Sequence, residues 1–214
     1  MEILKSMLFV GIQEEEFEDM SRALCLRERN FDKNEIIFHM GYVPHEVGIV
    51  QVGSVIIEGS TRSGSAAVLG RFGAGEVFAE SYALCKKPMM VSVIAAEKCS
   101  ALFLDMDIVL SSKYIERTWR EVLLRNMLYI AAEKNMILSS RIFCTTPKSV
   151  RGRVLAYLSE EAVMTGSSEF KIPFDRQKMA DYLNVDRSAL SKELGRMRDE
   201  GIIEFKKDRF TIKK

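Results

Sequence analysis

The sequence has few of the features that mark membrane-spanning, secreted or disulfide-bonded proteins. No apolar run approaches the roughly 18–20 residues that a membrane-crossing helix needs, so we expect no membrane partner. The four cysteines, Cys25, Cys85, Cys99 and Cys144, lie far apart without a Cys-x-x-Cys pair, which fits reduced thiols better than a disulfide framework. The N-terminal residues lack a basic start and a small-residue cleavage site, so we expect a cytoplasmic protein.

Histidine is equally scarce, and this scarcity limits catalysis. His39 and His45 are the two histidines of the chain. We find no Ser-His-Asp set, no metal-ligand triad and no Gly-rich phosphate-binding loop, so we expect no enzyme and no metal site. A metalloenzyme built on a β-sheet domain is the weakest of the alternatives that stay open.

Charge is unevenly distributed along the chain although the net charge is only +1. Residues 147–214 contain 15 Lys and Arg against 11 Asp and Glu, whereas the remainder contains 16 against 19. A mildly acidic first part and a basic last part predict two modules, of which the second can approach phosphates.

Short β-rich runs separated by glycines dominate residues 35–105. The runs are EIIFHM, EVGIVQV, SVIIEGS, AAVLGRF, VSVIAA and SALFLD. Regular short strands with glycine turns predict an antiparallel sandwich or barrel. The segment STRSGSA is typical of a hairpin tip, and residues 14–29 have the apolar spacing of a short amphipathic helix.

A long helix is predicted from Asp107 to about Phe143, because this segment contains neither glycine nor proline and is rich in good helix formers. Its apolar residues recur in alternating steps of four and three, as they do in coiled coils. We therefore predict a dimer interface formed by Leu123, Met127, Ile130, Lys134 and Ile137. The alternative is a helix that only covers its own β-domain.

The last part of the chain has the pattern of a winged helix-turn-helix. Thr146 is a candidate N-cap with Pro147 at the first helical position, and Gly166 suits the end of the helix that follows. Asp175 and Asp186 are candidate N-caps of two further helices, and Asn184 between them suits a left-handed turn. The segment after Gly201 predicts a small hairpin.

One face of the second helix suits DNA. Side chains near the N-terminus of a recognition helix read bases in the major groove, and we assign this role to Arg187, Ser188, Ser191 and Lys192. Phosphate contacts are assigned to Arg176, Gln177, Lys206 and Lys207. The alternative is a helix pair that binds protein rather than DNA.

Taken together, these motifs make the chain resemble the CRP/FNR family of transcription regulators over its whole length. The motifs are VQVGSVII (50–57), FGAGEVFAES (72–81) and DRQKMADYLNVDRSALSKELGRMRDEGII (175–203). The resemblance implies an α+β protein with a jelly-roll-like antiparallel β-roll effector domain (1–106), a dimerisation helix (107–143) and a winged helix-turn-helix (144–214). It also implies a homodimer, a pseudo-palindromic double-stranded DNA operator and RNA polymerase as a further partner. Ser188 replaces the family's frequent glutamate, so we expect a different operator half-site.

The same resemblance argues against cyclic AMP as the effector. Members that bind cyclic nucleotides place a glutamate on the ribose and an arginine-serine pair on the phosphate. Glu80 matches the glutamate, but Met90 and Val91 align with the arginine and serine. Burying a phosphate without a bidentate arginine is unfavourable.

We therefore expect an unidentified small organic effector, apolar or aromatic with one polar handle. Its predicted pocket between the β-roll and the long helix is formed by Phe78, Glu80, Ser81, Met89, Met90, Val91, Lys134, Leu138 and Ser139. Haem stays open as a cofactor because histidine and methionine are present, whereas an iron–sulfur cluster is not expected because only Cys25 lies near the N-terminus. The remaining alternative is that the segment is packed core and binds nothing.

Overall fold

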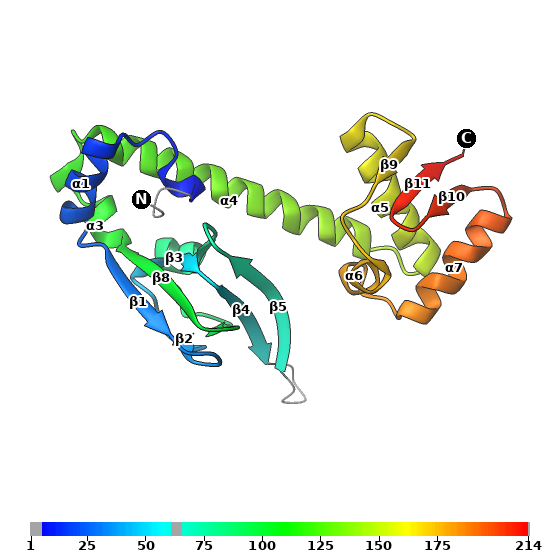
Figure 1. Cartoon of the computed structure of the whole chain (residues 1–214), viewed down its shortest axis with the longest axis horizontal. Coiled ribbons are helices and arrows are strands. Elements are labelled where there is room, and N and C mark those ends of the chain that lie inside the picture. The colour runs from blue at the N-terminus through cyan, green and yellow to red at the C-terminus, as the bar shows by residue number, and fades with distance from the viewer. Residues whose placement is uncertain (1–5, 61–65, 214) are drawn as a thin grey trace. The chain divides into compact units, whose positions relative to one another are not determined.

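The computed structural model describes residues 6–60 and 66–213, which fall into two compact units. The N-terminal unit is Met1–Ala132 and the C-terminal unit is Glu133–Lys214. One continuous helix, α4 (Thr118–Thr145), contributes its first part to the N-terminal unit and its last part to the C-terminal unit (Figure 1).

Two four-stranded antiparallel sheets form the N-terminal unit, as the short strands predicted. Their orders are β1-β8-β3-β6 and β2-β7-β4-β5. The strands are β1 (Arg27–Phe31), β2 (Ile36–Phe38), β3 (Glu46–Val52), β4 (Ser54–Ser60), β5 (Ala66–Gly73), β6 (Val77–Phe78), β7 (Ser92–Ala95) and β8 (Cys99–Asp105). Antiparallel pairing of β4 with β5 agrees with the predicted hairpin, whose tip lies outside the described residues.

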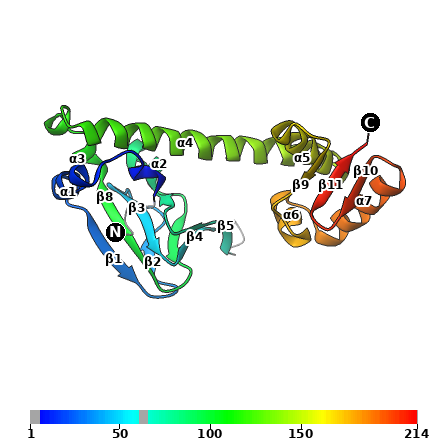
Figure 2. The ribbon, with the colours of Figure 1, turned by 45° about the horizontal axis from the view of Figure 1, so that its top comes forward.

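Short helices flank these sheets: η2 (Met7–Phe9), α1 (Glu14–Ala23), α2 (Glu80–Cys85), α3 (Met106–Leu110) and η3 (Ser112–Tyr114). The helix predicted over residues 14–29 is shorter than expected, because β1 begins at Arg27 and pairs with β8. Figures 1 and 2 show α1 and α3 beside the first part of α4, where Phe17, Val109 and Trp119 share one core.

The long helix begins later than the sequence indicated. Asp105 caps α3 by accepting from the backbone N–H groups of Asp107 (2.8 Å) and Ile108 (3.3 Å), and the chain turns through η3 before α4 starts at Thr118. The absence of glycine and proline from residues 107–143 therefore did not make the helix continuous, because a local cap and tertiary packing decided its start.

The predicted dimer seam needs revision for three of its residues. Leu123, Met127 and Ile130 are 0%, 3% and 7% exposed, and they pack into the core of their own N-terminal unit. These side chains are not available to a partner chain. Lys134 is half-buried, and Ile137 is exposed.

Besides the last part of α4, the described residues of the C-terminal unit form three helices and a three-stranded antiparallel sheet of order β10-β11-β9. Its elements are α5 (Val150–Thr165), β9 (Glu169–Lys171), α6 (Arg176–Tyr182), α7 (Arg187–Asp199), β10 (Ile203–Lys206) and β11 (Arg209–Ile212). Helix, turn, helix and hairpin follow one another as predicted. Gly166 ends α5 with a φ of +65°, which also agrees with the prediction.

The start of α5 differs from the prediction. Ser149, not Thr146, is the N-cap, since the Ser149 hydroxyl accepts from the backbone N–H of Gly152 at 3.0 Å. The Thr146 hydroxyl instead donates to the carbonyl of Ile142 at 2.7 Å, at the end of α4. Pro147 therefore lies in the connection between the two helices rather than at a first helical position.

Candidate functional site

The turn between α6 and α7 is built from the local interactions that the sequence indicated. Asp175 caps α6, because its side chain accepts from the backbone N–H of Lys178 at 2.8 Å. Asn184 takes a φ of +51°, the left-handed conformation expected of it. The next residue, Val185, packs against the hydrophobic core of the C-terminal unit. These features fix the angle at which α7 leaves the turn.

Asp186 caps α7 and also holds Ser188. Its carboxylate accepts from the backbone N–H groups of Ser188 (2.7 Å) and Ala189 (3.1 Å) and from the Ser188 hydroxyl (2.5 Å). The Ser188 hydroxyl and the two N–H groups hold the pKa of the Asp186 carboxyl below its ordinary value. The hydroxyl predicted to read a base is thus already engaged in the cap.

The apolar face of α7 anchors the helix and leaves its other face open. Leu190, Leu194 and Met197 are buried in the core, as their spacing predicted. The candidate base-reading side chains Arg187, Ser188, Ser191 and Lys192 are all exposed.

Charge pairing differs between the two halves of α7. Arg196 lies 3.6 Å from the carboxylate of Glu193, and Arg198 lies 2.9 Å from that of Asp199. Within residues 6–60 and 66–213, in contrast, Arg187 and Lys192 have no acidic partner within ion-pair distance. The N-terminal half of α7 therefore presents uncompensated positive charge to solvent.

Two arginines of α5, which the sequence analysis missed, support the helix-turn-helix. Arg153 donates to the carbonyl of Pro147 (2.8 Å) through Nε and to those of Leu183 (3.1 Å) and Asn184 (2.7 Å) through Nη1. Arg151 donates to the carboxylates of Glu193 (2.6 Å) and Glu200 (2.7 Å). Two arginines inside the otherwise apolar stretch VRGRVLAYL were the available signal, because charged side chains in a segment that packs into a core are rarely left without partners.

The hairpin of β10 and β11, here called the wing, carries the other candidate phosphate contacts. Lys206 and Lys207 are exposed at its tip, where Lys207 has a φ of +58°. Gln177 is exposed on α6 and donates to Asp181 at 2.9 Å. Arg176 is half-buried, and its guanidinium lies over aromatic rings of the wing.

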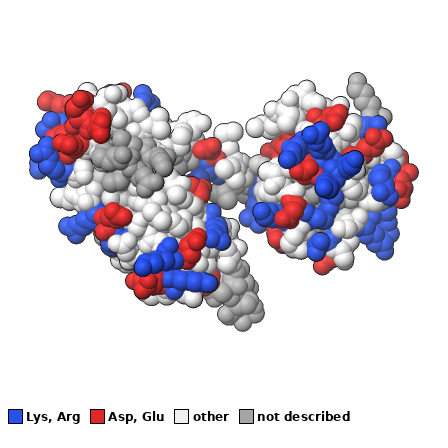
Figure 3. Space-filling view, in the orientation of Figure 1, with Lys and Arg blue, Asp and Glu red and all other residues white. Residues whose placement is uncertain are grey.

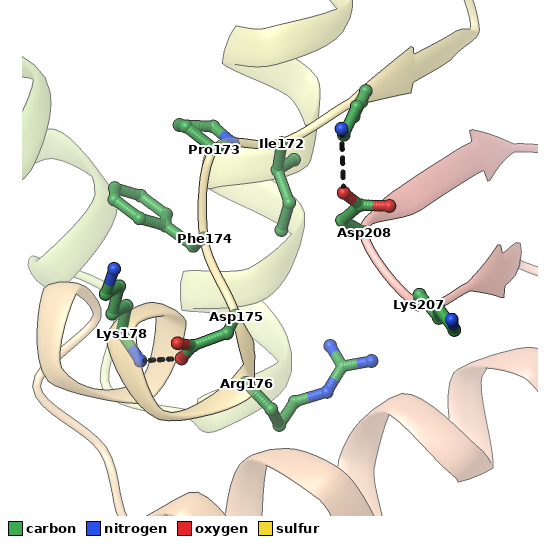
Figure 4. Close-up of a pocket in the computed structure, with 9 residues that line it drawn as sticks. Ile172, Pro173, Phe174, Asp175, Arg176, Lys178, Lys207 and Asp208 are labelled. Carbon is green, nitrogen blue, oxygen red and sulfur yellow. Dashed lines mark hydrogen bonds and ion pairs between the residues drawn. The ribbon is translucent and has the colours of Figure 1, made fainter.

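A hollow of about 530 Å³ lies where the wing meets the start of α6 (Figure 4). Four of its nine lining residues are basic, although Lys171 is paired with Asp208 at 3.1 Å. In Figure 3, Lys and Arg side chains cover much of the visible face of the C-terminal unit, with acidic side chains among them.

Comparison with known families identifies both units. A model of the cyclic nucleotide-binding domain matches residues 28–111, and a model of the Crp-like helix-turn-helix domain matches residues 152–214. The chain belongs to the CRP/FNR family of transcription regulators. It is thus a DNA-binding regulator of Crp-like fold with an effector-binding type of domain, as the resemblance implied.

Solved structures of the CRP/FNR family share this fold. The catabolite activator protein of Thermus thermophilus is 21% identical, with 97% of this chain and 94% of that chain covered and a TM-score of 0.52. A CooA mutant from Carboxydothermus hydrogenoformans is 19% identical, with 98% and 92% covered and a TM-score of 0.61. CprK complexed with OCPA is 14% identical, with 92% and 91% covered and a TM-score of 0.65. A search of curated proteins found no match.

The residues predicted to line the effector pocket of this CRP/FNR regulator divide by exposure. Phe78, Glu80, Met89 and Val91 are buried, whereas Met90 is 78% exposed. Lys134 is half-buried. The remaining three residues, Ser81, Leu138 and Ser139, are exposed. Since the last part of α4 belongs to the C-terminal unit, the pocket between β-roll and helix stays a prediction.

Aromatic rings of the chain itself pack together in the core of the β-roll. Phe38, Phe78 and Phe103 contact one another with ring centroids 5.9–6.1 Å apart. A Cβ added to Gly48 would lie 2.0 Å from the Phe78 ring, so glycine is required there for the ring to fit. Among the described residues there is no group of three or more His, Cys, Asp or Glu that could hold a metal ion. Nor does that part of the chain include a helix both long and apolar enough to cross a membrane.

Proposed function

We propose that this protein is a homodimeric, sequence-specific DNA-binding regulator that acts in the cytoplasm and is controlled by a small organic effector other than a cyclic nucleotide. The observation that carries the DNA-binding part is the charge pattern of α7. Its N-terminal half presents Arg187 and Lys192, which have no acidic partner among the described residues, while Arg196 and Arg198 in its C-terminal half are paired with acids. A recognition helix reads bases with its N-terminal residues, where this charge lies.

Roles of individual residues follow from exposure and existing partners. Arg187 and Lys192 are exposed cations that suit guanine O6 and N7, and Ser191 is an exposed donor and acceptor. Ser188 contributes to the start of α7 by donating its hydroxyl hydrogen to Asp186, so while that bond is kept the hydroxyl can read a base only as an acceptor. Gln177, Lys206 and Lys207 suit phosphates. RNA polymerase stays a predicted partner.

The outer face of α4 supports the homodimer. Leu128, Ala132, Asn135, Ser139 and Ile142 follow alternating steps of four and three, and all five are exposed. Leu128 and Ile142 are 72% and 66% exposed, and exposed Met136 and Phe143 flank the same face. Large apolar side chains exposed along one helix are typical of an interface, and the steps of four and three are those of a coiled coil, in which single polar residues also occur. A two-fold dimer would bind half-sites about 34 Å apart.

Selection from a random double-stranded DNA library, followed by fluorescence anisotropy at several salt concentrations, tests the DNA-binding function. We expect one pseudo-palindromic sequence to be enriched. Because several lysines and arginines would replace counterions, affinity should fall by about three orders of magnitude between roughly 50 and 200 mM salt. Equal binding to all sequences, or affinity that ignores salt, would contradict the proposal.

Two observations support an effector other than a cyclic nucleotide. The resemblance aligns Met90 and Val91 with the arginine and serine of the phosphate clamp of cyclic-nucleotide-binding members, and neither side chain can donate a hydrogen bond. The rings of Phe38, Phe78 and Phe103 also occupy the roll interior. A buried phosphate would be left without its bidentate partner.

Thermal unfolding with cyclic AMP or cyclic GMP tests this part. We expect no change in melting temperature at millimolar nucleotide, because the native state gains no binding energy. A ligand present at a hundred times its Kd stabilises by about 2.7 kcal/mol, which is about 5–10 °C for a chain of this size. A saturable rise of that size would refute the effector proposal, and the selected operator DNA serves as the positive control.

A further inference from the structure

Arg176 lies in a setting that its predicted role as a phosphate contact does not explain. It is the first residue of α6, and its guanidinium carbon is 5.1 Å from the ring centroid of Phe205 and 5.7 Å from that of Phe210. Both rings belong to the wing. In Figure 4 the Arg176 side chain extends from the start of α6 toward the wing rather than away from it.

A second arginine reaches the same ring from the other helix. The guanidinium of Arg198, on α7, lies 5.9 Å from the ring centroid of Phe205. The ring of Phe205 is therefore contacted by a cation from each helix of the helix-turn-helix. A guanidinium over an aromatic face is attractive, more so when it is partly removed from water. Arg176 is half-buried, and burial lowers the pKa of its guanidinium, although arginine stays charged in proteins.

The two rings form the second rung of the hairpin, counted from its tip. Phe205 pairs with Phe210 in the β10–β11 register, and the rings stack with centroids 5.6 Å apart. Lys206 and Lys207 follow Phe205 immediately, and Lys206 pairs with Arg209 in the last rung. The direction in which the tip lysines point is thus set by how this aromatic rung is held against α6 and α7.

We propose that Arg176 is a positioning residue for the wing: by stacking on the Phe205–Phe210 rung, it sets the direction of the wing tip and so places Lys206 and Lys207 on the DNA backbone. This inference rests on the proposed DNA-binding function. Arg176 then contributes to affinity through the two lysines, and its own guanidinium need not touch a phosphate.

A double-mutant cycle on operator binding tests the proposal, with the full-length protein and the selected operator. Arg176→Gln removes the cation, and Phe205→Leu removes the ring while leaving every charge in place. We expect each variant to bind the operator roughly 5–20-fold more weakly, because the tip lysines lose phosphate contacts when the aromatic rung is no longer held by Arg176. The double variant should bind no more weakly than the weaker single variant, because the two residues act as one unit.

The salt dependence separates positioning from direct contact. Each phosphate contact adds about 0.9 to the slope of log affinity against log salt. We expect Phe205→Leu to lose as much slope as the double variant Lys206→Ala/Lys207→Ala, although Phe205→Leu removes no charge. The Arg176→Lys variant should bind the operator as weakly as Arg176→Gln does, because lysine lacks the planar group that stacks on the rung.

Three outcomes would overturn the proposal: wild-type operator affinity of Phe205→Leu, additive losses of operator affinity in the double variant, or wild-type operator affinity of Arg176→Lys. Lys148→Gln is the matched control, since it removes one exposed charge outside the wing, and its effect should add to that of Phe205→Leu. Circular dichroism and melting temperature establish that each variant folds, and retained preference for the operator over scrambled DNA shows that α7 is intact. Wild-type protein without sequence preference or salt dependence would instead refute the proposed function itself.

Discussion

Arg187→Ala is expected to weaken operator binding by about 2–6 kcal/mol per dimer, because each bidentate contact of an arginine with guanine contributes about 1–3 kcal/mol and a dimer makes two. Arg187 is the first residue of α7 and is exposed. In the described part of the chain it has no acidic partner within ion-pair distance, so no internal contact is lost. Alanine is a good helix former, and α7 should stay folded.

The measurement is fluorescence anisotropy with the selected operator and with operators altered at single base pairs. If Arg187 reads a base, the variant should lose discrimination at one position of each half-site and keep it elsewhere. Arg196→Ala is the matched control, since it makes the same change on the same helix, where Arg196 faces Glu193. An equal loss on every sequence would mean that Arg187 contacts phosphate, and no loss at all would place the DNA interface elsewhere.

The helix-turn-helix could be predicted from the sequence because its determinants are local. Asp175 and Asp186 cap helices through backbone N–H groups two or three residues ahead, and Asn184 adopts its left-handed φ within one turn. Interactions of such short range depend on residue type and spacing alone. The same pattern at Thr146 and Pro147 gave the wrong cap, because Ser149 competes for the role three residues later.

The supporting arginines could not be predicted, because their partners are distant in sequence. Arg153 meets carbonyl groups about thirty residues away, and Arg176 meets rings on the wing. Nothing in the residue type separates an arginine that holds the fold from one that contacts DNA. Only the packed structure, which brings α5 onto the turn and the wing onto α6, makes that distinction.

The interior of the effector domain could not be predicted from the sequence for the same reason. The sequence placed Glu80, Met90 and Val91 by resemblance, but the filling of the roll depends on Phe78 crossing to Gly48 on a neighbouring strand. Whether the β-roll encloses a ligand pocket or a packed core therefore depends on tertiary packing. The alternation of apolar and polar residues along single strands does not predict that packing.

The faces of α4 were ambiguous for a related reason, because the helix is apolar on two sides. Leu123, Met127 and Ile130 lie in the core of their own chain, and Leu128 and Ile142 lie on another, exposed face. Both sets repeat with heptad-like spacing, so periodicity cannot say which one meets a partner. A substitution on each face can show which of the two meets a partner chain.

Leu128→Glu is expected to turn the dimer into a monomer. Leu128 is 72% exposed in the single chain, so the change removes little internal packing. In the proposed dimer it would bury two carboxylates near the two-fold axis, which costs several kcal/mol and raises the dimer Kd by about 100-fold or more. Operator affinity should fall by about 10²–10⁴, because the two half-sites no longer bind as one linked unit. Size-exclusion chromatography with light scattering measures the mass, and anisotropy measures the binding.

Val163→Glu is the matched control, since it places the same charge at an apolar residue that is 80% exposed on α5, outside α4. It should leave mass and operator affinity unchanged. Ile137→Glu tests the seam that the sequence predicted, because Ile137 is 57% exposed and lies on the same side of α4 as Ile130. If Ile137→Glu breaks the dimer while Leu128→Glu does not, the interface follows the predicted seam beyond the N-terminal unit. If neither does, the outer face of α4 is not the interface, and the chain dimerises elsewhere or acts as a monomer.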